Sequence, residues 1–303
     1  MTHIRIGTRA SALALWQANH IADLLRQVPS VGSVELVRIE TTGDAVQDRP
    51  LSAMGGFGVF TREIQNALLD RRVDVAVHSL KDLPTLFVEG LKLIATPARA
   101  PIGDAFISHK YSKFDDLPAG ATLGTSSLRR RAQILNRRPD LNLIDLRGNV
   151  DTRLRKLRDQ NLDGIILAQA GLIRLGFENQ ITERLDPEWM LPAVGQGAIG
   201  LECREDNVEA VEALRTINDP KTWNAVLAER SMLFALGGGC LVPIGVQSIA
   251  EAETLTLRAA VLSQDGRQRI YDQISGASDR PQELGALLAG KLLDAGAKQL
   301  LLN

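Results

Sequence analysis

Short runs of β-branched and other apolar residues alternate with longer amphipathic stretches along this chain. Ile4–Ile6 and Val34–Ile39 are typical of strands, and the apolar residues of Leu13–Leu24 recur at helical spacing. A third alternating run is predicted to form a strand that ends at His78. Strands that alternate with helices in this order predict an α/β architecture, in which helices cover a mostly parallel sheet.

The middle third repeats the same strand, turn and helix order. Ala121–Gly124 is predicted as a strand that leads through Thr125–Ser127 into a helix. Leu141–Leu146 leads into a second helix, and Ile165–Leu167 into a turn over 168–171. From Pro220 a helix, a glycine-rich loop and alternating strands indicate a separate α+β unit.

Composition limits the class of protein. The 303 residues are enough for two or three domains. Thirty-five Lys and Arg against 36 Asp and Glu give a net charge of −1, so we expect no nucleic-acid or membrane partner. The N-terminus lacks signal-peptide character, and two cysteines suit a reducing cytosol, so a cytoplasmic location is expected. Two cysteines and four scattered histidines make no zinc site, and no metal is expected.

Arginines and serines recur at the predicted turns from strand to helix. Helix N-termini at the carboxyl edge of an open α/β sheet favour anions, and guanidinium groups add bidentate recognition of carboxylate or phosphate. The repetition predicts a ligand with several negative charges. The alternative is that each serine only caps a helix and each arginine is solvated surface. The residues are Arg9, Ser11, Ser127, Arg129, Arg130, Arg147 and Arg153.

Lys81 and Asp82 close the strand that ends near His78. Asp82 is a candidate acid/base, or a carboxylate that stabilises a cationic intermediate. The alternative is that Asp82 only initiates the turn before Pro84. Both interpretations stay open at this point.

Two cysteines are present, and they differ in their surroundings. Cys240 follows three glycines at the end of a helical pattern, on an approachable loop that is compatible with a slow covalent attachment. Cys203 is predicted to be a buried strand cysteine.

Six motifs in order resemble the porphobilinogen deaminase family, also called hydroxymethylbilane synthases. They begin at Gly7, His78, Gly124, Leu146, Ala193 and Gly238, and read GTRAS, HSLKDLP, GTSSLRR, LRGNV, AVGQG and GGCLVPIG. The resemblance implies two doubly wound domains like the halves of periplasmic binding proteins, with a cleft between them, and a smaller C-terminal α+β domain. It also implies a discontinuous first domain. The expected boundaries are 1–98 and 193–217 for domain 1, 99–192 for domain 2, and 218–303 for the C-terminal domain.

The resemblance implies a transferase of tetrapyrrole (haem) biosynthesis. It would join four porphobilinogen molecules head to tail, release ammonia at each addition, and free the linear hydroxymethylbilane. A dipyrromethane cofactor, held by a thioether to Cys240, would be the primer. The family further implies a monomer whose partner is the small-molecule substrate.

The roles of individual residues follow from the matching motifs. Asp82 would be the catalytic carboxylate that stabilises positive charge as ammonia leaves. The implied cofactor-binding residues are Cys240, Lys81, Ser127, Arg129, Arg130 and Arg147. The implied substrate-binding residues are Arg9, Ser11, Arg153, Arg174 and Gln196.

Two other functions stay open from the residues alone. A non-catalytic binding protein for a small polycarboxylate would use the same two-lobed fold, but this alternative does not explain the presence of Cys240. An enzyme acting on phosphate esters would use the same helix N-termini, but no P-loop is present.

Overall fold

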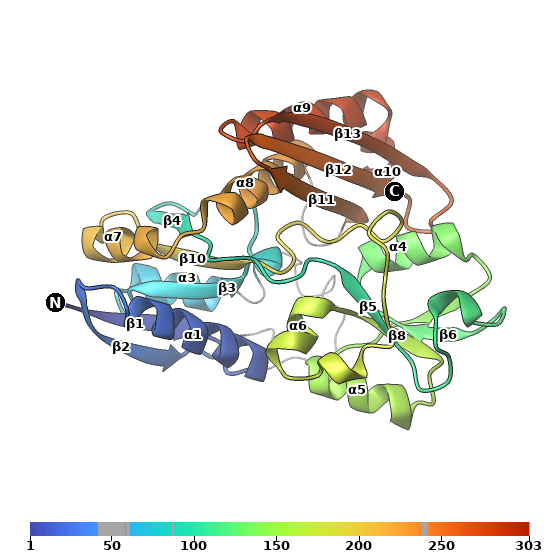
Figure 1. Ribbon diagram of the computed structural model, residues 1–303, viewed down its shortest axis with the longest axis horizontal. Helices are drawn as coiled ribbons and strands as arrows, with labels where there is room; N and C mark the ends of the chain where they lie inside the picture. Colours follow the sequence, from blue (N-terminus) through green and yellow to red (C-terminus); the bar gives the residue numbers. More distant parts are fainter. Residues whose placement is uncertain (42–57, 59–60, 87, 238–241, 303) are drawn as a thin grey trace. The chain divides into compact units, whose positions relative to one another are not determined.

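The computed structural model describes residues 1–41, 58, 61–86, 88–237 and 242–302 (Figure 1). The chain forms two compact units, Met1–Ala100 with Gly197–Trp223, and Pro101–Gln196 with Asn224–Asn303. A five-stranded sheet lies in the first unit, and a five-stranded and a three-stranded sheet lie in the second. The finer division into domains at 1–98, 99–192, 193–217 and 218–303 stays a proposal.

The first unit is built on a sheet of order β2-β1-β3-β10-β4. β1 runs parallel to β2 and β3, whereas β10 enters antiparallel between β3 and β4. The elements are β1 (Thr2–Thr8), α1 (Ala12–Leu25), β2 (Val31–Arg38), α3 (Arg62–Leu69), β3 (Val75–Ser79), η2 (Leu80–Asp82), β4 (Leu91–Ala95), β10 (Ile199–Arg204) and α7 (Val208–Thr216).

Helices cover both faces of this sheet because its central strand is apolar on both sides. Val75 and Val77 of β3 pack with α1 and α7 in one core. The intervening Ala76 packs with α3 in another. Strand side chains alternate between faces, so two opposed cores result.

The second unit carries a sheet of order β7-β6-β8-β5-β9, in which β6 is parallel to β7 and β8. β5 is antiparallel to β8 and to β9. The elements are β5 (Asp104–Ile107), η3 (Phe114–Asp116), β6 (Thr122–Gly124), α4 (Leu128–Arg137), β7 (Asn142–Ile144), α5 (Val150–Asp159), β8 (Gly164–Ala168), α6 (Gln169–Arg174), η4 (Glu178–Gln180) and β9 (Glu183–Arg184).

This second sheet is also covered on both faces. Phe106 packs with Ile134 of α4 in one core, whereas Ile107, the next residue of β5, packs with α5 and α6 in the other. The predicted turn over 168–171 is wrong, because helix α6 begins at Gln169, directly after β8. Gly171 lies inside that short helix.

The remaining part of the second unit is an antiparallel sheet of order β11-β12-β13. Leu255 and Leu257 of β12 are fully buried against the helices of the same core. Figure 1 shows α9 lying along this sheet. The elements are α8 (Pro220–Ala235), which begins in the first unit and enters the second at Asn224, β11 (Ile244–Glu251), β12 (Thr254–Leu262), β13 (Arg269–Ala277), α9 (Pro281–Asp294) and α10 (Ala297–Leu302). The predicted fold class, two α/β sheets with helices on both faces and a smaller C-terminal α+β part, is confirmed.

Candidate functional site

At the carboxyl edge of the first sheet, strand ends bring Arg9 and Ser11 to the same side as Lys81 and Asp82. β1 and β3 are adjacent and parallel, so the residues that follow them emerge at one edge. The Ser11 hydroxyl accepts from the Ala14 amide (3.3 Å) and caps α1. Arg9, Lys81 and Asp82 are half-buried. The structure therefore brings together these four predicted site residues of the first unit.

Asp82 ends the short 3-10 helix η2, and its side chain does not make the turn. The backbone makes it, because the Leu83 amide donates to the Leu80 carbonyl (3.1 Å). Within the part of the chain that the structure describes, the Asp82 carboxylate has no hydrogen-bond or ion-pair partner. A half-buried carboxylate with unused acceptors at a sheet edge suits a role toward a ligand better than a turn-forming role.

Side chains on three other elements brace the turn that carries Asp82. The Gln17 amide of α1 donates to the Ser79 hydroxyl (2.9 Å), which donates back to the Gln17 carbonyl oxygen (3.1 Å). Nε2 of buried His78 lies 3.1 Å from Oε2 of Glu202 on β10, and the Gln65 amide donates to both Glu202 oxygens (3.1 Å). The end of β3 is therefore fixed on both sides. No local sequence signal pointed to Glu202, because it lies 124 residues from His78 along the chain.

The second sheet carries five more predicted residues at its own carboxyl edge, namely Ser127, Arg129, Arg130, Arg147 and Arg153. β6, β7 and β8 are parallel neighbours, and a helix follows each of them. Ser127 caps α4 by accepting from the Arg130 amide (3.5 Å). Between β7 and α5, Gly148 has φ +114°, a conformation that favours glycine. The Gly148 carbonyl accepts from Nε of Arg153 (2.7 Å). Arg147 and Arg153 are half-buried at this turn.

Arg174 is the last residue of α6 and is largely buried. Burial lowers the pKa of its guanidinium to about 10, which still leaves it protonated at neutral pH. It lies at the C-terminal end of the helix that follows β8.

Arg129 and Arg130 are buried, and each is only 5% exposed. The alternative that they are solvated surface residues is therefore wrong. Arg129 Nη2 lies 2.8 Å from Asp104 Oδ2, and Arg130 Nη2 lies 2.8 Å from Asp104 Oδ1. We therefore expect neutralising either arginine to lower the stability of the fold as well as ligand binding. Removing one partner of a buried pair typically costs about 3–5 kcal/mol, because the other charge is left buried and unpaired.

The Asp104 carboxylate gives the protein an acid-labile contribution to stability. Burial raises the pKa of Asp104, but the charges and hydrogen bonds of Arg129 and Arg130 outweigh burial and lower it to about 2. The unfolded value is about 3.9, so the stabilisation is present above about pH 4 and is lost as the pH falls toward 2. Its size is about 2–3 kcal/mol.

We therefore expect Asp104→Asn to flatten the dependence of the unfolding free energy on pH between pH 5 and 2.5. Urea unfolding across that range measures the slope. Asp115→Asn breaks an exposed ion pair with Arg137 (2.9 Å) and should leave the curve close to that of the wild type. Equal slopes for Asp104→Asn and wild type would contradict the assignment.

Gln196 is the last residue of the second unit before the chain returns to the first. Its side-chain amide donates to the Ile102 carbonyl (2.7 Å) and to Asp104 Oδ1 (2.9 Å). The side chain is 1% exposed. The substrate contact predicted for Gln196 stays a prediction, and the contacts observed belong to the Asp104 cluster.

The predicted attachment residue, Cys240, lies outside the described residues. Cys203 is fully buried in β10, as predicted. Burial raises the pKa of its thiol to about 12, which suppresses the reactive thiolate. Cys203 is therefore the natural control for any experiment on Cys240.

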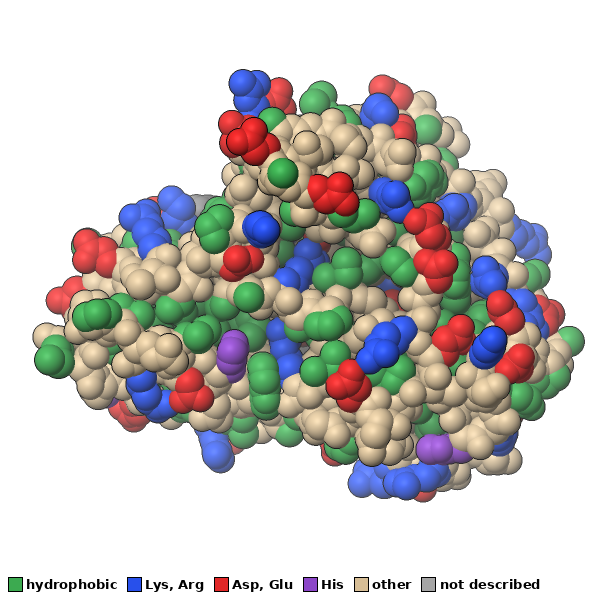
Figure 2. All heavy atoms as spheres, in the orientation of Figure 1, with side chains coloured by type: hydrophobic (Ala, Val, Ile, Leu, Met, Phe, Trp, Pro, Cys, Tyr) green, Lys and Arg blue, Asp and Glu red, His purple; other side chains and the backbone are tan. Residues whose placement is uncertain are grey.

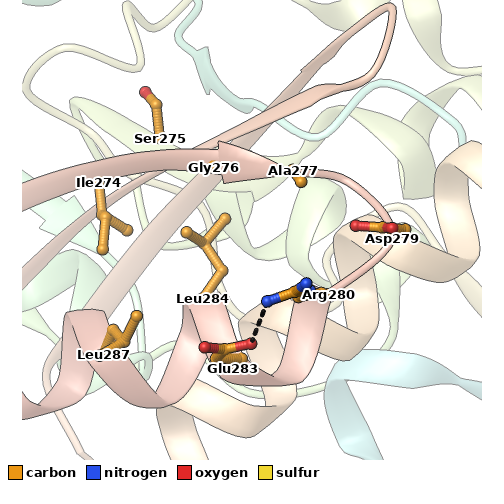
Figure 3. A pocket seen from close by; sticks show the side chains of 9 residues that line it. All are labelled: Ile274, Ser275, Gly276, Ala277, Asp279, Arg280, Glu283, Leu284 and Leu287. Carbon is orange, nitrogen blue, oxygen red and sulfur yellow. Dashed lines mark ion pairs between the residues drawn. The ribbon is translucent and has the colours of Figure 1, made fainter.

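A hollow of about 320 Å³ lies on the C-terminal sheet, and none of the described site residues lines it (Figure 3). β13, α9 and the turn between them line it, with Ile274, Leu284 and Leu287 as its apolar part. Arg280 and Glu283 form an ion pair of 3.8 Å on its wall. We assign this hollow no part in the site.

Charges of both signs intermingle on the face drawn in Figure 2. Among the described residues, no helix is both long and apolar enough to cross a membrane. In the same residues, no group of three or more His, Cys, Asp or Glu side chains is arranged to hold a metal ion.

Family models match almost the whole chain. One, described as "Porphobilinogen deaminase, dipyromethane cofactor binding domain", matches residues 4–212. Another, described as "Porphobilinogen deaminase, C-terminal domain", matches residues 223–294. The chain belongs to the porphobilinogen deaminase family. Membership confirms the resemblance drawn from the six motifs, the transferase class and the presence of a dipyrromethane cofactor-binding domain.

Full-length relatives carry the same family name. The porphobilinogen deaminase of Trichlorobacter lovleyi is 50% identical over 299 residues, which are 98% of this chain and 95% of the relative. That of Geobacter metallireducens is also 50% identical, over 98% of this chain and 93% of the relative. Among solved structures, the methionine-binding protein MetQ aligns with 71% of this chain and 89% of the MetQ chain. The sequence identity is 14% and the TM-score is 0.46. This structural likeness is too weak to carry an argument.

Proposed function

We propose that the chain is a hydroxymethylbilane synthase that condenses four porphobilinogen molecules head to tail, with loss of ammonia, on a covalent dipyrromethane primer. Membership of the family places the protein in tetrapyrrole biosynthesis. The observation that carries the finer proposal is the row of cationic and hydrogen-bonding groups at the carboxyl edge of the second sheet. Each pyrrole of the substrate bears an acetate and a propionate, so a growing chain is strongly anionic and needs such groups.

The residues present fit the dipyrromethane group. Buried Nε of Arg129 and the buried Ser126 hydroxyl have no hydrogen-bond partner among the described residues, and both lie at the start of α4. Buried donors left without a partner are costly unless a ligand satisfies them. The residues that would hold the group are Cys240, by a thioether, with Lys81, Ser127, Arg129, Arg130 and Arg147. When bound, the group supplies a covalent primer with a terminal pyrrole to extend.

The acidic and basic residues of the chain have different roles in the proposed reaction. Asp82 holds a negative charge where positive charge develops on the substrate pyrrole as ammonia leaves, and so stabilises the transition state. Arg9, Arg153 and Arg174 bind substrate carboxylates, with Ser11 as a hydroxyl donor. These groups orient the substrate before the bond forms, which is a large part of the rate gain in a bimolecular condensation.

Intact mass of the purified protein tests the proposal against the binding-protein alternative. A hydroxymethylbilane synthase carries a covalent excess equal to two linked pyrrole units, and that excess should remain after denaturation. A non-covalent polycarboxylate-binding protein shows the mass of the unmodified chain. The unmodified mass in protein made by cells that supply porphobilinogen would overturn the proposal.

A further inference from the structure

Asp104 is the buried carboxylate that joins two of the predicted cofactor-binding arginines. We propose that it is a positioning residue, which fixes the orientation of the Arg129 and Arg130 guanidinium groups toward an acidic ligand. This inference rests on the proposed function, because that function supplies the ligand.

The direction of one strand brings Asp104 to the functional edge. β5 is antiparallel to β8, and Asp104, its first residue, pairs with Ala168, the last residue of β8. The amino end of β5 therefore lies where the parallel strands β6 and β8 end. A parallel strand in this place would have sent its first residue to the opposite edge.

The Asp104 carboxylate is fully buried, and each of its oxygens lies within ion-pair distance of one arginine. Oδ1 accepts from Arg130 Nη2 (2.8 Å) and Nε (3.2 Å). Oδ2 lies 2.8 Å from Arg129 Nη2. Gln196 adds an amide donor to Oδ1 (2.9 Å), which fixes the rotation of the carboxylate itself. One carboxylate thus sets the positions of two guanidinium groups.

A backbone carbonyl holds each guanidinium at a second point. Arg130 Nη1 donates to the Ile166 carbonyl (2.9 Å), and Arg129 Nη1 donates to the Leu191 carbonyl (2.5 Å). Two fixed points on a planar group set its orientation. The buried Nε donor of Arg129 is left without a partner among the described residues. The cluster therefore holds the arginines in place without using all of their donors.

The charges of the cluster do not cancel. Two guanidinium groups remain protonated in proteins, so one carboxylate leaves a formal charge of +1 in a buried place. A cluster that served stability alone would be better with a second acid, since uncompensated buried charge is costly. A rigid cation pair that is only half neutralised is suited to a ligand carboxylate, which then pays little entropy to find its donors in place.

The test compares Asp104→Asn with Asp74→Asn. Asp74 also lies between two arginines, with Arg5 Nε at 2.9 Å and Arg204 Nη2 at 3.9 Å. It lies just before β3, at the end of the sheet opposite to Asp82. Both variants lose an ion-paired carboxylate, so both should melt earlier. We measure the Michaelis constant for porphobilinogen, kcat, and the fraction of molecules carrying the primer mass, well below both melting temperatures.

Because Arg129 and Arg130 are the proposed primer-binding arginines, a positioning role predicts that Asp104→Asn lowers the primer fraction by about tenfold or more, with a smaller rise in KM. Asp74→Asn should keep both near wild-type values. Asp104→Glu restores the charge one methylene away, so it should recover much of the primer fraction and give an intermediate KM. Equal KM and primer fraction in the two asparagine variants would overturn the proposal.

If Asp104→Asn does not fold, Asp104→Glu decides alone. A lowered primer fraction supports the positioning role, and a wild-type primer fraction overturns it. Failure of the proposed function looks different, because then the wild type itself forms no tetrapyrrole and carries no added mass.

Discussion

Asp82→Asn should lower turnover by about 1000-fold or more, with little change in substrate binding. The substitution keeps the shape of the side chain and removes its charge. A fixed charge beside a developing cation acts on the transition state rather than on the bound substrate, so kcat falls and KM does not. The Asp82 carboxylate has no hydrogen-bond or ion-pair partner in the described part of the chain, so removing its charge breaks no such interaction there. Initial rates with porphobilinogen give the effect, and thermal melting checks that the fold is kept.

Asp82→Glu is the matched variant, because it keeps the charge and displaces it by about one methylene. A displacement near 1 Å costs about 100-fold in rate, so glutamate should retain reduced activity and keep the primer. Near-wild-type turnover in Asp82→Asn would return Asp82 to the role of a turn residue.

Cys240→Ser should yield folded protein with no covalent primer and essentially no product. A serine hydroxyl is a far weaker nucleophile than a thiol and should not form the attachment. Intact mass and the pyrrole chromophore report the primer, and initial rate reports the product.

Cys203→Ser is the control for the same experiment. Its thiol is fully buried in β10, with its pKa raised to about 12, so it is no candidate for attachment. This variant should keep both primer and rate, with some loss of stability from a hydroxyl placed in the core. A Cys240→Ser protein that still carried the primer would show that the attachment residue is another one.

Much of the fold follows from local patterns. The run Ile4–Ile6 lies inside β1, and the predicted helix after Ser127 is α4, because strand and helix periodicities are carried by neighbouring residues. The place of β10 between β3 and β4 could not be predicted. Its partners lie more than 100 residues away, and an apolar run does not reveal its direction.

The site residues likewise include some that local sequence predicts and others that depend on distant parts of the chain. Ser11 and Ser127 are caps that the sequence shows directly, since a serine after a strand and before a helical run is a local signal. The burial of Arg129 and Arg130 depends on Asp104, which precedes them by 25 and 26 residues on an antiparallel strand. The one sequence signal for Asp104 is that this acid directly precedes the apolar run 105–107. Ion pairing between residues far apart in the sequence depends on the tertiary fold. Residue type alone therefore predicts that Arg129 and Arg130 are exposed, although they are buried.

The central claim is that this chain converts porphobilinogen into a linear tetrapyrrole. Purified protein incubated with porphobilinogen should release four ammonia for each hydroxymethylbilane that appears, as measured by product chromatography and an ammonia assay on the same samples. Stoichiometric binding of porphobilinogen without ammonia release or tetrapyrrole, by protein whose fold is intact, would contradict the account.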